Sequence, residues 1–305
     1  MRTASILTAL LFAILAGCDD PTDDDTVADD DDSTGEPGLA PCTFADAPVA
    51  RFAVTQRGAD EWSVSVTGEV WEEPYPSWHQ VLRESENCRY MVYLPGSCDP
   101  PCAGGELCTA DSECVGWPTG VAAGTMTVEG LGDPLVIEPL DHAPGSYYTS
   151  LTLPLDQFGE LAPISVSLSG DIFPAVELAA RGVSQVVADA AADGLPIPDA
   201  EPVTVSWNAG QDPGACAEVH LYTQNMGHGL PIINVMECIG PDIGSLTIPA
   251  EMTDIWPDWT TPGVCAGIDC PYSEVVRHTR QIVPTDAGDA WLTASSRSQF
   301  KLLGE

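Results

Sequence analysis

Cysteine is the residue type in this sequence with the most evident chemistry. Four cysteines, Cys98, Cys102, Cys108 and Cys114, lie close together and are separated by three, five and five residues. Clustered thiolates bind zinc in a reducing compartment, whereas the same cysteines form disulfides in an oxidising one. The chemistry of this cluster therefore depends on whether the chain is exported.

The N-terminal segment predicts export. An apolar run from Ile6 to Ala16, interrupted only by Thr8, carries no charge and is too short to span ~30 Å of hydrocarbon as a helix. The run ends in Leu15-Ala16-Gly17-Cys18, which resembles the lipobox of bacterial lipoproteins. The resemblance implies that residues 1–17 are a signal peptide and that Cys18 becomes the acylated N-terminus. Membrane lipid is then a partner of the chain.

The number of cysteines agrees with this interpretation. There are eleven, and a lipid on Cys18 leaves ten, an even number that suits disulfides. We therefore expect disulfides and no metal site. Residues 98–114 resemble small EGF-like loops, which implies that the first cysteine pairs with the third and the second with the fourth. The sequence does not fix the other pairs, for which proximity suggests Cys42 with Cys88, Cys216 with Cys238, and Cys265 with Cys270.

No catalytic or cofactor motif is found in the sequence. The five histidines form no H-E-x-x-H pattern, and the chain lacks the G-x-S-x-G elbow, the P-loop and the G-x-G-x-x-G fingerprint. His220 and His228 come nearest to a metal-ligand pair, but they lack a clear third ligand. We expect no cofactor and assign no catalytic residue.

Aromatic side chains are the candidates for ligand binding. They lie in two proline-containing segments of the kind that form binding loops in sandwich folds, where they could stack on a glycan or contact a surface protein. The alternative is that they cover small local cores. The candidates are Trp71, Tyr75, Trp78, Trp256 and Trp259.

The charge of the chain excludes some partners. Its 305 residues include 46 acidic and ten basic ones, giving a formal net charge of −36. Such a surface repels nucleic acid, so we expect no nucleic-acid partner, and it attracts divalent cations only non-specifically. Residues 18–41 combine the lipidated cysteine with an Asp-rich stretch. We expect this segment to be a disordered linker that holds the body away from the membrane.

The remaining sequence predicts an all-β protein built from antiparallel β-sandwich modules similar to immunoglobulin or fibronectin type III domains. Alternating apolar and polar residues indicate strands, among them 62–71, 147–153 and 203–207, with Trp207 between the sheets. Short helices are expected at 78–86, 186–192 and 249–255. A proline-containing stretch near 193–202 predicts two domains. These are an N-terminal β domain, 42–194, which contains the cysteine-rich segment 98–114, and a C-terminal sandwich-like domain, 195–305.

The lipobox, the Asp-rich linker, the motif Cys-Asp-Pro-Pro-Cys at 98–102 and the sandwich strands together resemble an uncharacterised family of myxobacterial-type lipoproteins. The resemblance implies location and architecture and transfers no catalytic residue. We expect a lipid-anchored envelope or cell-surface protein that serves as a non-catalytic binding, adhesion or structural module. The long acidic linker favours the outer membrane or cell surface over the inner membrane facing the periplasm. The alternative is an envelope hydrolase that acts on glycans or peptides through acidic residues.

Overall fold

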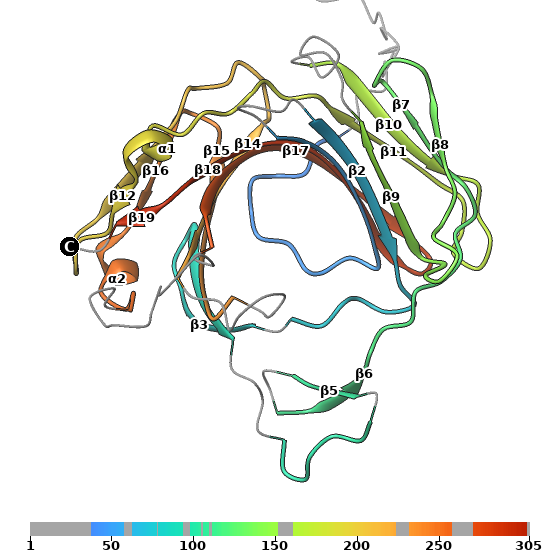
Figure 1. Cartoon of the computed structure of the whole chain (residues 1–305), viewed down its shortest axis with the longest axis horizontal. Helices are drawn as coiled ribbons and strands as arrows, with labels where there is room; N and C mark the ends of the chain where they lie inside the picture. Colours follow the sequence, from blue (N-terminus) through green and yellow to red (C-terminus); the bar gives the residue numbers. More distant parts are fainter. Residues whose placement is uncertain are drawn as a thin grey trace, which may run out of the picture. The chain divides into compact units, whose positions relative to one another are not determined.

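Strands dominate the described part of the chain (Figure 1). The computed structural model describes residues 38–57, 63–77, 79–93, 98–104, 106–109, 112–151, 161–223, 232–257 and 271–303. Six residues singled out in the sequence lie outside these ranges, as does the expected signal peptide: Cys18, Trp78, His228, Trp259, Cys265 and Cys270. In the described residues, no helix is both long and apolar enough to cross a membrane.

The elements follow one another along the chain with two short helices among the strands. They are β1 (Ala50–Arg57), β2 (Ser63–Val70), β3 (His79–Glu84), β4 (Cys88–Tyr93), β5 (Glu106–Cys108), β6 (Cys114–Gly116), β7 (Met126–Glu129), β8 (Leu135–Ile137), β9 (Ser146–Leu151), β10 (Pro163–Leu168), β11 (Val176–Arg181), α1 (Ala190–Asp193), β12 (Leu195–Pro196), β13 (Val203–Ser206), β14 (Cys216–Tyr222), β15 (Asn234–Pro241), β16 (Ser245–Ile248), α2 (Ala250–Thr253), β17 (Ser273–Thr285), β18 (Gly288–Phe300) and β19 (Leu302–Leu303).

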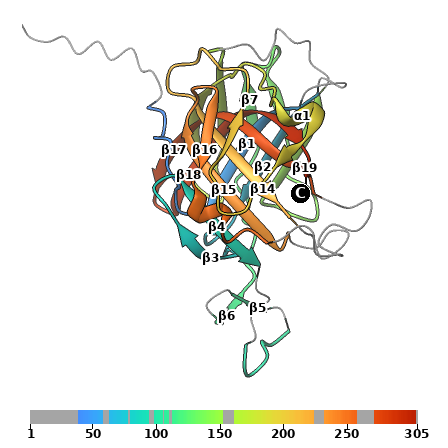
Figure 2. The ribbon, with the colours of Figure 1, turned by 90° about the vertical axis from the view of Figure 1, so that its left-hand side faces the viewer.

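A nine-stranded sheet organises the fold. Its order is β3-β4-β15-β14-β17-β18-β1-β2-β9, and Figure 2 shows β4, β15 and β14 lying side by side. Neighbouring strands are antiparallel, as expected, except β1 and β18, which are parallel. The sheet takes strands from both sides of the boundary expected between 194 and 195, and residues 37–305 form one compact unit. The predicted division into 42–194 and 195–305 therefore does not separate two sheets.

The nine-stranded sheet curves, and its convex face is covered in a sandwich-like arrangement (Figure 1). The four-stranded sheet β11-β10-β7-β8 packs against β1, β2 and β18 over a core that includes Phe52, Val66 and Val166. The two-stranded sheets β13-β16 and β12-β19 lie over β14, β15 and β17. Their core includes Trp207 and Leu221. The all-β sandwich class predicted from the sequence is confirmed, and Trp207 lies between sheets as expected.

A buried ion pair lies between the two cores. Arg277 on β17 and Asp242 have side chains with 0% and 1% exposure, and Arg277 Nε donates to Asp242 Oδ2 at 2.5 Å. Trp207 Nε1 donates to the other oxygen of this carboxylate at 2.6 Å. Arg277 also donates to backbone carbonyls of Ser184, Gln185 and Asn208. A buried charge is tolerated only when it is paired and hydrogen-bonded, and this guanidinium satisfies both conditions.

One predicted helix is a strand in the structure. Residues 78–86 were expected to be helical, but His79–Glu84 form β3, which is held at the sheet edge by pairing with β4. Four of its six side chains are exposed, so the segment carries none of the alternation that marks a half-buried strand. The helices expected at 186–192 and 249–255 overlap α1 and α2, which are four residues each.

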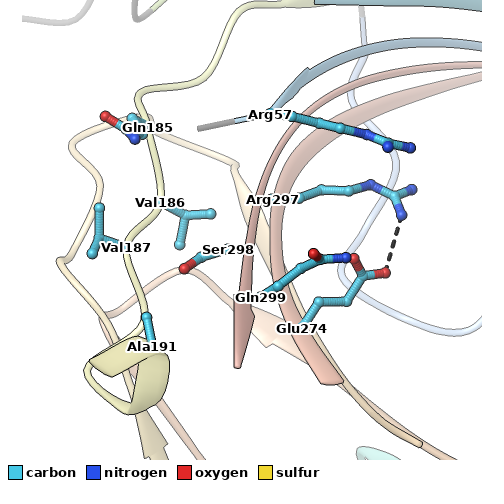
Figure 3. A pocket seen from close by; sticks show the side chains of 9 residues that line it. All are labelled: Arg57, Gln185, Val186, Val187, Ala191, Glu274, Arg297, Ser298 and Gln299. Carbon is cyan, nitrogen blue, oxygen red and sulfur yellow. Dashed lines mark hydrogen bonds and ion pairs between the residues drawn. The ribbon is translucent and has the colours of Figure 1, made fainter. Parts of the chain in front are cut away.

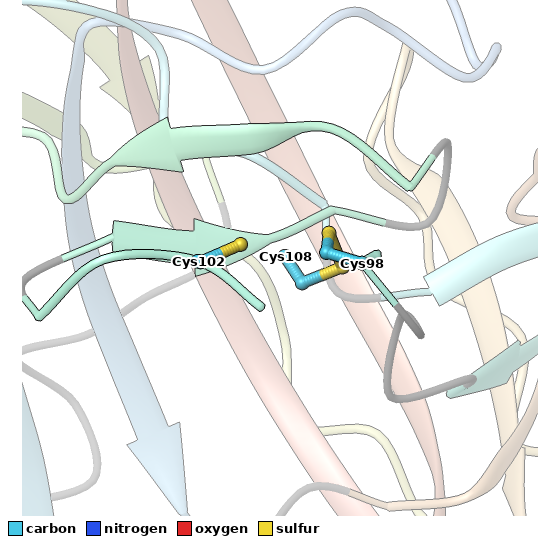
Figure 4. A group of neighbouring side chains, drawn as sticks. All are labelled: Cys98, Cys102 and Cys108. Atoms are coloured by element: carbon cyan, nitrogen blue, oxygen red, sulfur yellow. A yellow bond between two sulfur atoms is a disulfide. The ribbon is translucent and has the colours of Figure 1, made fainter. Parts of the chain in front are cut away.

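Four disulfides join the eight cysteines of the described chain. The cysteine-rich segment pairs Cys98 with Cys108 (Figure 4) and Cys102 with Cys114, as the EGF-like resemblance implied. The sulfurs of this segment lie close enough for a shared metal, but each is bonded to another sulfur. Two of the three pairs suggested for the other cysteines are wrong, because the structure joins Cys42 to Cys216 and Cys88 to Cys238. The third, Cys265 with Cys270, lies outside the described residues. Sheet pairing places Cys88 directly opposite Cys238, which proximity in the sequence does not show.

Candidate functional site

The concave face of the nine-stranded sheet carries most of the arginines of the folded body. Five of the eight arginines after residue 37 lie there, although the whole chain has a net charge of −36. We call this surface the basin. Its charged or titratable residues are Arg51, Arg57, Arg89, Arg280, Arg297, Glu69, Glu218, Glu237, Glu274, His220 and His278.

Strand alternation places these side chains in the basin. On β14, Glu218, His220 and Tyr222 alternate with Val219 and Leu221, whose side chains are buried in the core beneath the convex face. The same period of two applies to β17 and β18. Their basin positions are residues 274, 276, 278 and 280 on β17 and residues 291, 293, 295 and 297 on β18.

Two cavities open on the basin. The larger has a volume of about 610 Å³, and Tyr148, Trp291 and Arg297 are among the residues that line it. The second, of about 310 Å³, lies between residues 43–45 and the strands that carry Glu218 and His220. The segment before β1 thus forms one wall of a cavity above the sheet.

Covalent and hydrogen bonds fix this N-terminal wall. The amide of Ala40 donates to the carbonyl of Arg280 at 2.7 Å, and Cys42 is bonded to Cys216 at the start of β14. Residues 38–41 were expected to belong to a disordered linker, but they are described here and Ala40 is hydrogen-bonded to β17. The folded body therefore begins before the expected position of residue 42.

His220 is the centre of an ion network on the basin floor. Its Nε2 lies 3.0 Å from Glu218 Oε2, and its Nδ1 lies 3.4 Å from Glu274 Oε1. Each of these carboxylates also binds an arginine at 3.0 Å, Glu218 through Arg280 and Glu274 through Arg297. One imidazole thus links two carboxylate–arginine pairs on neighbouring strands.

The network sets the protonation state of its members. Burial disfavours the charged form of His220, but hydrogen bonds to Glu218 and Glu274 outweigh it and raise the pKa of His220 to about 10. Burial would raise the pKa of Glu218, yet neighbouring His278, His220 and Arg280 hold that pKa well below its usual range. The pKa of Glu274 is lowered too, because His220 and Arg297 outweigh the effect of burial. Near neutral pH, both carboxylates are ionised and His220 is a cation.

His278 behaves in the opposite way. Its side chain is 2% exposed, and burial lowers the pKa of His278 to about 4, so the ring is neutral near pH 7. Its Nδ1 is buried and has no hydrogen-bond partner in the described structure, as is also true of Trp291 Nε1 and Arg297 Nε. Most buried polar atoms in proteins have partners. All three side chains line the larger cavity.

Arginine stacking on aromatic rings further orders the basin and its rim. Cations over ring faces are attracted by the ring quadrupole, and guanidinium groups stack there readily. The guanidinium carbons lie 5.0, 4.3 and 4.9 Å from the ring centroids in the pairs Arg51–Trp71, Arg89–Phe44 and Arg280–Trp291.

Three of the aromatic residues proposed from the sequence as binding residues, Trp71, Tyr75 and Trp256, are described, and each is buried or half-buried. Trp256 is 7% exposed in a core and meets Tyr90 edge-on. Trp71 is 9% exposed and packs against Tyr75, which also contacts Trp117. For these three, the contacts match the alternative of small local cores. The candidate surface in the basin contains Trp291 and Tyr148 instead, which the sequence interpretation did not select.

Comparison with known proteins does not assign this chain to a family. No protein-family model and no curated protein matches it. Among solved structures, one similar chain comes from the crystal structure of Dpr11 IG1 bound to DIP-gamma IG+IG2. It has 10% identity, 88% of this chain and 98% of that chain covered, and a TM-score of 0.17. Another comes from the crystal structure of DIP-gamma IG1+IG2, with 8% identity, 87% and 99% coverage, and a TM-score of 0.17. Likeness at this TM-score supports no conclusion, so fold and site rest on the geometry described above.

Proposed function

We propose that this chain is an exported lipoprotein whose folded body binds a ligand in the basin without converting it. The sequence Leu15-Ala16-Gly17-Cys18 and the odd number of cysteines support export and lipid attachment at Cys18. Four disulfides in the described chain are typical of a protein that folds in an oxidising compartment. We place the body at the outer membrane or cell surface on the strength of the acidic linker.

The basin is the observation that carries the proposal. Ligand sites are concave and contain a small number of placed polar groups. The larger cavity, of about 610 Å³, combines the rings of Trp291 and Tyr148 with charged side chains. Such a lining suits a glycan or a segment of a surface protein that carries polar groups.

The protonation states support binding over hydrolysis. A carboxylate-based hydrolase needs one carboxyl group with a raised pKa to act as the acid. Glu218 and Glu274 have lowered pKa values, and His220 holds its proton to about pH 10, so none of the three exchanges a proton readily near neutrality. His278 is neutral there, but among the described residues no hydroxyl or thiol hydrogen-bonds to it. The ionised groups of the described basin are therefore suited to bind a charged or polar ligand, and they are not suited to transfer protons.

The test is calorimetry with the mature lipoprotein in detergent micelles. A panel of neutral and anionic oligosaccharides and peptides is titrated into the wild type, Trp291→Ala and the matched control Trp117→Ala, whose tryptophan is 45% exposed outside the basin. We expect at least one ligand whose affinity falls tenfold or more in Trp291→Ala and is unchanged in Trp117→Ala.

Two outcomes contradict the proposal. If no ligand binds, or if both variants bind it as the wild type does, the basin is not a binding site. If a bound glycan or peptide is cleaved and Glu218→Gln stops the cleavage, the chain is a hydrolase.

A further inference from the structure

Two arginines lie directly opposite each other at one end of the basin. Arg57 on β1 and Arg297 on β18 are partners in the parallel register of these strands. Figure 3 shows their side chains extending to the same side, parallel to one another. Like charges in directly opposed cross-strand positions are destabilising unless an anion lies near them.

Among the described residues, the carboxylate of Glu274 lies near both arginines. Glu274 Oε1 accepts a bond from Arg297 at 3.0 Å, whereas Arg57 makes no hydrogen bond or ion pair with any described residue. Arg297 Nε is also buried without a hydrogen-bond partner. Each of the other basin arginines has a glutamate at 3.0 Å or less: Arg51 with Glu69, Arg89 with Glu237 and Arg280 with Glu218. The pair at this end thus keeps one positive charge that no described side chain neutralises.

A cavity lies beside this pair. It has a volume of about 310 Å³ and is lined by two groups of residues. Figure 3 shows Arg57, Glu274, Arg297 and Gln299 extending to one side, away from the second group, which consists of Gln185, Val186, Val187, Ala191 and Ser298. β18 continues to Phe300, whereas its pairing with β1 ends at the position of Arg57. Arg57 is therefore the last residue of β1 that pairs with β18, and its exposed side chain lines the cavity.

We propose that Arg57 and Arg297 bind an oxyanion group, a carboxylate or a sulfate ester, carried by the ligand of the basin. Guanidinium groups present parallel N–H donors that match the oxygens of such anions. Glu274 also lies 3.4 Å from His220, so this one carboxylate has three positively charged neighbours, and an anionic group of the ligand would add negative charge where it is in deficit. Because the remainder of this chain is strongly acidic, general attraction to the surface does not supply the binding energy.

The test uses sodium acetate, sodium methyl sulfate and sodium phosphate at constant ionic strength, with the mature lipoprotein in detergent micelles at pH 8. A ligand that binds the folded state at ten times its Kd raises the folding equilibrium constant about tenfold, so Tm rises with its concentration. We expect acetate or methyl sulfate to raise the Tm of the wild type and to have no effect on Arg57→Ala. Arg83→Ala is the matched control, since it removes an exposed strand arginine outside the basin and should respond like the wild type.

The outcomes separate a binding role from a structural one. Arg57 makes no hydrogen bond or ion pair within the described chain, so Arg57→Ala should have an unchanged Tm without added anion, and a large fall in that Tm would indicate a structural residue. No response of the wild type to acetate or methyl sulfate, or an equal response of Arg57→Ala, overturns the inference. A larger response to phosphate overturns the assignment of a carboxylate or a sulfate ester. Since the inference rests on the proposed function, a neutral ligand that is lost in Trp291→Ala but unaffected in Arg57→Ala would refute the anion site alone.

Discussion

His220 makes the stability of this protein sensitive to alkaline pH. Its pKa is about 10 in the folded state against 6.5 in an unfolded chain, because it is held between Glu218 and Glu274. A group whose pKa is raised by folding contributes its full stabilisation below the unfolded pKa. That stabilisation is lost as the pH rises through the folded pKa. Between pH 7 and pH 10, we expect the free energy of unfolding to fall by about 3 kcal/mol, since the loss approaches about 1.4 kcal/mol per pH unit.

The composition leaves few other titrations between pH 7 and pH 9. Asp, Glu and Arg side chains ordinarily change charge outside this range, and the chain has one lysine. Burial raises the pKa values of Tyr90, Tyr147 and Tyr222 above 10.0, so these tyrosines add a smaller loss of stability as the pH approaches 10, where the unfolded chain ionises. Burial lowers the pKa of His278 to about 4, so its ring is neutral here in the folded state.

The assay is urea unfolding of the mature lipoprotein at pH 7, 8, 9 and 10. His220→Gln removes the titrating group, so its free energy of unfolding should start lower than that of the wild type and stay nearly constant up to pH 9. His142→Gln is the matched control because His142 is exposed, and it should follow the wild type. The reasoning is refuted if the wild type shows no decline, or if His220→Gln declines as steeply.

Three further predictions concern the anchor, the buried ion pair and the disulfides. Cys18→Ala should abolish palmitate labelling and leave an unprocessed precursor, and continued labelling would contradict the lipobox. Asp242→Ala leaves the charge of Arg277 buried without its ion-pair partner, so the free energy of unfolding should fall by about 3–5 kcal/mol in urea titrations. A loss below about 1 kcal/mol would show that the pair is not buried as described. Peptide mapping without reduction should recover a peptide that joins Cys42 to Cys216, and a link from Cys42 to another cysteine would contradict the structure.

The sequence predicts strands well where one face is apolar throughout. β2 alternates buried valines with polar residues over its whole length, and its position was predicted to within one residue at each end. The hairpin β17–β18, whose strands are 13 residues each, was not predicted. Its alternation is broken because Arg277 and Thr279 lie on the convex side, where apolar residues are expected. Both are buried through specific hydrogen bonds to distant backbone carbonyls.

The basin was missed because its residues are far apart in the sequence. The Glu274–Arg297 pair depends on the β17–β18 hairpin, and Arg57 joins it only through the parallel pairing of β1 with β18. A local signal did exist: Glu218, His220 and Tyr222 alternate on a predicted strand, which places three polar side chains on one face. The partners that give His220 its charge lie partly on β17, so no local pattern identifies them.

The disulfide between Cys42 and Cys216 also determines how the folded body carries mechanical load. A pull on the proposed lipid anchor would travel along residues 38–41, where Ala40 is hydrogen-bonded to Arg280, and would reach its first covalent cross-link at Cys42. There the disulfide passes the force to β14, an interior strand that is hydrogen-bonded to β15 on one side and β17 on the other. Residues 43–49 and β1 lie beyond this point and bear little of the tension. A force on the proposed anchor is therefore resisted by the middle of the sheet, and residues 43–45, which form the wall of the cavity, carry little of it.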